Sequence, residues 1–67
     1  MSNIDRTLYL KKAQSMWDAM TNSERTGIRF GMFPVLHIQA AKDEGYDGEY
    51  LTSALIEVAK TNGGMVS

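Results

Sequence analysis

The sequence predicts an all-α fold, a compact single domain of about four short helices that covers residues 1–67. Three observations lead to this prediction. Apolar residues recur at helical spacing in two long segments, residues able to cap a helix precede the segments, and glycine or proline separates them. The chain contains no repeat, low-complexity tract or linker that would mark a domain boundary.

The first helix is expected from about Asn3 to Met20, with Ser2 or Asn3 as its N-cap. Its apolar face comprises Tyr9, Leu10, Ala13, Met16, Trp17 and Met20, and its opposite face carries Lys11, Ser15 and Asp18. This division is typical of a half-buried helix.

A second helix is expected over residues 22–30, because Thr21 and Glu24 have the spacing of a capping box and Gly31 can end the helix. The alternation of apolar residues over 28–33 also fits a strand. We favour the helix, because no other segment offers a partner strand.

A third helix is expected from Pro34 to about Glu44, with apolar residues on both sides, so we predict that it is central. Asp47 caps the last helix, and Asn62 ends it. The apolar stripe of the last helix, at helical spacing, comprises Leu51, Ala54, Leu55 and Val58. Large apolar residues predicted for the core are Met16, Trp17, Met20, Phe30, Met32 and Phe33.

Composition restricts the possible means of stabilisation. A chain of 67 residues has a thin stability margin, and with no cysteine and one histidine it has neither a disulfide nor a Cys/His zinc site. We expect no cofactor. The sequence lacks an apolar run of the roughly 20 residues that span a membrane, and it lacks a signal-peptide core, so a cytoplasmic protein without membrane contact is expected.

The corner between the last two helices, residues 40–51, invites two specific interpretations. Ala41, Gly45 and Leu51 resemble the spacing of a helix-turn-helix, although Glu44 stands where that motif favours an apolar residue. The outward positions that follow are Glu49, Thr52, Ser53 and Glu57. Such carboxylates repel phosphates, so direct nucleic-acid binding is not expected, and a small helix-turn-helix-like transcriptional regulator is kept as the alternative function.

A calcium loop beginning at Asp43 is excluded by its third and twelfth positions, which are Gly45 and Ala54 in place of oxygen ligands. Catalysis is not expected either. His37 lies between apolar residues, and the hydroxyls of Ser23 and Ser53 have no recognisable activating motif. We therefore predict that the protein is not an enzyme.

Two groups of residues are ill-placed for local stability and are therefore candidates for partner binding. Asp43 and Glu44 fall at a helix C-terminus, where the macrodipole disfavours carboxylates, and with Asp47 and Glu49 they form an acidic rim suited to a basic partner surface. The net charge is also uneven along the chain, since residues 1–33 carry +2 and residues 34–67, which include the acidic rim, carry −3.

The second group lies on the first helix. Ile4 and Leu8 project opposite the apolar face, near Lys11 and Lys12. Two apolar residues one turn apart suit a docking patch or a homodimer seam.

The stretches ERTGIRFGMFP (24–34) and GYDGEYLTSALIEVAKTNGGM (45–65) resemble small proteins carried by bacteriophages and related mobile elements. The resemblance implies a protein of the infected host's cytoplasm that occupies a surface on a host protein, such as a nuclease, a polymerase or a defence complex. We therefore expect a non-catalytic protein-interaction module, an inhibitor or modulator of a host protein.

Overall fold

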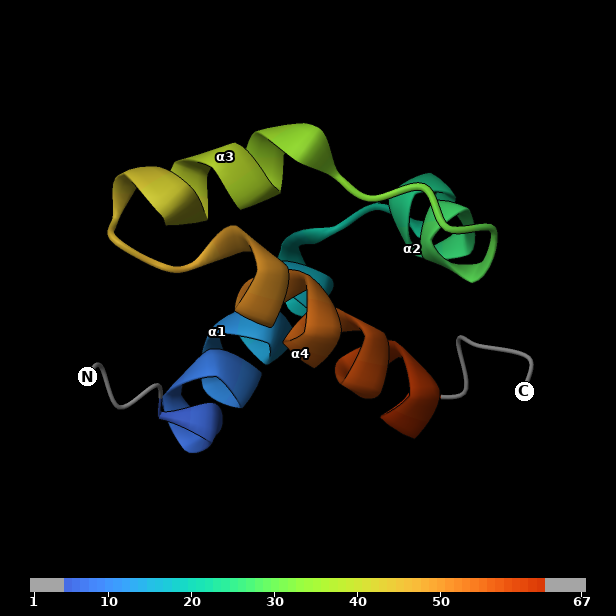
Figure 1. Cartoon of the computed structure of the whole chain (residues 1–67). Helices are drawn as coiled ribbons and strands as arrows, with labels where there is room; N and C mark the ends of the chain where they lie inside the picture. The colour runs from blue at the N-terminus through green and yellow to red at the C-terminus, as the bar shows by residue number, and fades with distance from the viewer. Residues whose placement is uncertain (1–4, 63–67) are drawn as a thin grey trace.

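The computed structural model of the chain describes residues 5–62, and in this range the chain forms four helices joined by short connections (Figure 1). They are α1 (Arg6–Ala19), α2 (Asn22–Arg29), α3 (Val35–Asp43) and α4 (Gly48–Thr61). The predicted all-α fold of four short helices is confirmed. None of these helices is long and apolar enough to cross a membrane.

Helix α1 begins later than predicted. Asp5 is its N-cap, since its backbone is extended and its carboxylate accepts a hydrogen bond from the Leu8 N–H at 3.2 Å. Aspartate caps a helix as well as serine or asparagine does. The predicted start at Asn3 is therefore wrong, and the proposed cap Ser2 lies outside the described residues.

The capping box of α2 is confirmed. The Glu24 N–H donates to the Thr21 Oγ1 at 3.1 Å, and the Thr21 N–H donates to the Glu24 Oε1 at 2.7 Å. The helix ends at Arg29, and Gly31 takes a positive φ of 78°. Residues 28–33 thus contain the end of a helix and an irregular connection, and the strand interpretation is excluded.

The core is formed mainly where α1 packs against α4. Helix α4 also contacts α3 and α2, so it is the central helix (Figure 1). Its predicted stripe is buried, together with Ala59. The other buried residues are Tyr9, Ala13, Met16, Trp17, Met20, Ile28 and Ala41.

Helix α3 is not central, contrary to the prediction. It buries only Ala41, while Val35 and Leu36 are 73% and 87% exposed. The physical reason is that the faces of α1 and α4 already cover each other. One side of α3 is then sufficient to cover the part of α4 that remains open.

The predicted core was partly wrong. Met16, Trp17 and Met20 are buried, and Phe33 packs against the core while half-buried. Phe30 and Met32, however, are 75% and 64% exposed. Helix α2 is short and offers the core only the buried Ile28, and Phe30 and Met32, which follow it directly, stay at the surface.

Two matched leucine truncations test this division between core and surface. Leu55→Ala is expected to lower the free energy of unfolding by about 2–5 kcal/mol, because it opens a cavity at a fully buried position. Leu36→Ala is expected to change it by less than about 0.5 kcal/mol. Urea unfolding followed by far-UV circular dichroism measures both, and equal losses would contradict the arrangement of α3 and α4.

Candidate protein-interaction surface

Four large apolar side chains lie exposed within seven consecutive residues, from the end of α2 to the start of α3. They are Phe30, Met32, Val35 and Leu36, and we call them the apolar surface. Single exposed apolar residues are common in soluble proteins, but a group of large ones is a candidate site of association. The sequence-based prediction missed this surface, although the run FGMFPVL offered a signal for it.

The end of α2 explains why Met32 points outward. The Met32 N–H donates to the Gly27 carbonyl at 2.9 Å and the Gly31 N–H donates to the Ile28 carbonyl at 3.0 Å, which is the pattern of a Schellman motif. Such a motif usually adds an apolar contact between the residues at the positions of Met32 and Gly27. Glycine has no side chain to provide this contact, and the Met32 side chain remains 64% exposed.

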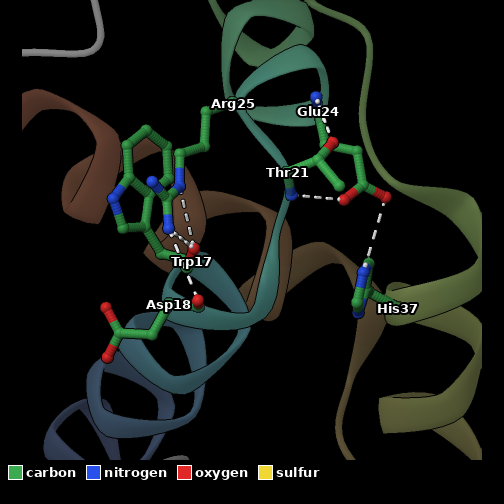
Figure 2. Close-up of polar contacts among 6 residues, drawn as sticks. All are labelled: Trp17, Asp18, Thr21, Glu24, Arg25 and His37. Atoms are coloured by element: carbon green, nitrogen blue, oxygen red, sulfur yellow. Dashed lines mark hydrogen bonds and ion pairs between the residues drawn. The ribbon is translucent and has the colours of Figure 1, made fainter.

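Arg25 attaches α2 to the end of α1 (Figure 2). Its Nε and Nη2 donate to the Trp17 carbonyl at 3.0 and 2.9 Å, and its guanidinium lies 5.4 Å from the centre of the Trp17 ring. The Trp17 carbonyl also accepts from the Met20 N–H at 3.2 Å, and a cation beside the last turn of a helix complements the macrodipole. The clamp fixes the direction in which α2 leaves the core.

Glu24 connects α2 to α3. Its Oε2 lies 3.5 Å from the Nε2 of His37, while its Oε1 serves the capping box (Figure 2). The hydrogen bond from the Thr21 backbone, followed by the charge of His37, lowers the pKa of Glu24 below its ordinary value. The polar contacts of Arg25, Glu24 and His37 thus hold the segment that carries the apolar surface, in addition to the core contacts of Ile28 and Phe33.

The structure brings some of the predicted binding residues together. Lys12 forms an ion pair with Glu44, with 3.0 Å between Nζ and Oε1, which joins α1 to the corner before α4. Leu8 is 48% exposed and Lys11 is exposed, as expected for the outer side of α1. Ile4 lies outside the described residues.

The acidic rim is partly engaged within the chain. Asp47 caps α4 by accepting from the Tyr50 N–H at 3.0 Å, and Glu44 is neutralised by Lys12. Asp43 accepts from the Gln39 Nε2 at 3.1 Å, and Glu49 is exposed. Local capping and pairing account for two of the four acids, so the rim is a weaker basis for a function than the apolar surface.

An open groove of about 510 Å³ between α3 and α4 is lined by Ile38, Lys42, Gly48, Glu49, Thr52 and Ser53. His37, the only histidine in the sequence, does not line it. The Ser53 hydroxyl therefore has no imidazole beside it to act as a base. Within residues 5–62, no three Asp, Glu or His side chains are grouped as metal ligands.

The lowered pKa of Glu24 predicts a pH dependence of stability. A carboxylate whose pKa is depressed in the folded state stabilises the fold at pH values above its pKa in the unfolded chain. This contribution is lost as the pH falls through its pKa in the folded protein. Wild type is therefore expected to exceed Glu24→Gln in unfolding free energy at about pH 7, and the gap is expected to close towards about pH 3. Urea titrations at several pH values measure the gap, and a pH-independent gap would contradict a role for the charge.

Comparison of the chain with protein-family models, with curated proteins and with solved structures found no match.

Proposed function

We propose that this protein is a non-catalytic protein-interaction module that binds its partner through the apolar surface. The observation that carries the proposal is the exposure of Phe30, Met32, Val35 and Leu36 beside a core that is already complete without them. Water must leave these side chains when a partner binds, and this burial is the main source of affinity in protein association.

The surface suits a protein better than a nucleic acid. Arg29 is the only charged residue within positions 29–36, and a phosphate backbone is bound chiefly by several lysines and arginines. The alternative function, a small helix-turn-helix-like transcriptional regulator, would require α4 to enter a DNA groove as the recognition helix. Helix α4 instead contacts the three other helices, and its first turn carries the exposed Glu49.

The surface is also held in a defined geometry before it meets a partner. The Arg25 clamp orients α2, and the contact between Glu24 and His37 connects α2 with α3. A preformed surface loses less conformational freedom on binding than a disordered one. The mechanism we propose is steric, since the bound module covers the partner's surface without changing it chemically.

The biological use that we propose follows from the resemblance to phage proteins. A module of this size that covers a functional site on a host nuclease, polymerase or defence complex would inhibit or modulate it. The exposed Glu49 and Asp43 would then lie outside the apolar contact, where charges set the rate and orientation of encounter more than the affinity.

Site-specific photo-crosslinking tests the proposed function. A benzophenone amino acid at Val35 is expected to form adducts with protein in an extract of the native cell, whether with another copy of this chain or with a different protein. The same group at Ser15, an exposed position on α1, is the control and is expected to give few adducts.

Competition makes the test specific to the surface. Excess wild-type protein is expected to suppress the Val35 adducts, and excess Leu36→Asp is not, because a buried carboxylate would oppose binding. Leu36 is exposed in the free chain, so this variant is expected to fold normally, which circular dichroism checks. Equal labelling from Val35 and Ser15, or equal competition by both proteins, would refute the proposal.

A further inference from the structure

The apolar surface continues along the side of α3 that faces away from the core. Leu36, Gln39, Ala40 and Asp43 follow one another at helical spacing and are all exposed. Ala41, the buried residue of α3, lies on the other side of the helix. We call this exposed stripe the outer face of α3.

The charges at the two ends of this region are opposite. Arg29 precedes the apolar surface at the end of α2, which lies beyond the N-terminal end of α3, and Asp43 ends the outer face (Figure 1). Among residues 5–62, neither side chain takes part in an ion pair, although Asp43 accepts a hydrogen bond from Gln39.

The centre of the region is free of charge. Lys42 and His37 belong to α3 but lie on its other sides. The stem of Lys42 packs close to Gly48 at the start of α4, and His37 contacts Glu24 of α2. A copy placed over the outer face would therefore meet uncharged side chains at its centre and a charge only at each end.

We propose that the apolar surface and the outer face of α3 bind a second copy of this chain, with the two α3 helices antiparallel about a two-fold axis. This inference rests on the proposed function, because it uses the same apolar surface, and it adds a second copy of the chain as a partner of that surface. A two-fold interface brings each end of the region against the opposite end of its copy. Arg29 of one chain then approaches Asp43 of the other, and this happens twice.

Helix packing supports the same arrangement. Leu36 and Ala40 are one turn apart, so in an antiparallel pair each leucine can lie over the alanine of the other chain. The small alanine allows the two helices to approach closely. The pairing also covers the outer face of α3, a helix of which only Ala41 is buried within one chain.

The size of the region limits the affinity. Stable interfaces use about 20–30 residues from each side, whereas this region spans residues 29–43 with only part of them exposed. We therefore expect dissociation in the range of about 10–500 μM. Such self-association covers the apolar surface and still allows a tighter-binding protein to displace the copy.

Sedimentation velocity over a range of protein concentrations tests the pairing. Wild type is expected to change from monomer to dimer with rising concentration, and Leu36→Asp is expected to weaken the dimer by about tenfold or more. Leu8→Asp is the matched control, because it changes a half-exposed leucine on α1, outside the region proposed to pair. A dimer lost in Leu8→Asp and retained in Leu36→Asp would overturn the inference and place the seam on α1.

Charge reversal tests the antiparallel orientation. Arg29→Glu alone and Asp43→Arg alone are each expected to weaken the dimer by about fivefold, because each places like charges together twice. The double variant Arg29→Glu with Asp43→Arg restores the opposite charges and is expected to recover most of the affinity. Additive losses in the double variant would overturn the proposed orientation.

The two experiments separate this inference from the proposed function. Monomeric wild type at about 1 mM, well above the expected dissociation range, would overturn the inference. If Val35 then still formed competable adducts with a different protein, the proposed function would stand. If Val35 formed none, both would fall.

Discussion

The burial of the apolar face of α4 against α1 is the interaction on which the remaining structure depends. The chain has no disulfide to stabilise it, because it contains no cysteine. Among residues 5–62, the fully buried large side chains are Leu51 and Leu55 of α4 and Ile28 of α2. The packing of α1 against α4 covers almost all of the apolar surface that these two helices present in a domain of this size. The short helices α2 and α3 then have little interior left to occupy.

At the edge of the core, polar contacts connect α2, α3 and the corner before α4 to the other helices. Arg25 binds the last turn of α1, Glu24 reaches His37, and Lys12 reaches Glu44 across 32 positions of sequence. Partly exposed polar contacts and ion pairs of this kind add little stability individually, but they fix the directions in which α2 and α3 run relative to the core. Because the core between α1 and α4 is small, α3 lies at the periphery, and Leu36 and its neighbours remain at the surface. The candidate binding site is therefore a consequence of the fold.

Local features of the fold were predictable from the sequence, and features that depend on the meeting of distant segments were not. The Thr21 capping box, the Asp47 cap and the α4 stripe require only short-range spacing, and all three are confirmed. The exposure of Phe30 depends on which surfaces of α1 and α4 are already covered, and apolar composition carries no such information. The Arg25 clamp likewise depends on the angle at which α2 leaves α1.

The Schellman motif at Gly31 has a consequence for how this protein can change by mutation. Because Gly27 has no side chain and Met32 is 64% exposed, the end of α2 places little constraint on the side chain at position 32. Substitutions there escape the stability threshold that limits most positions of a small domain. The chemistry of this part of the surface can thus vary while the scaffold stays unchanged.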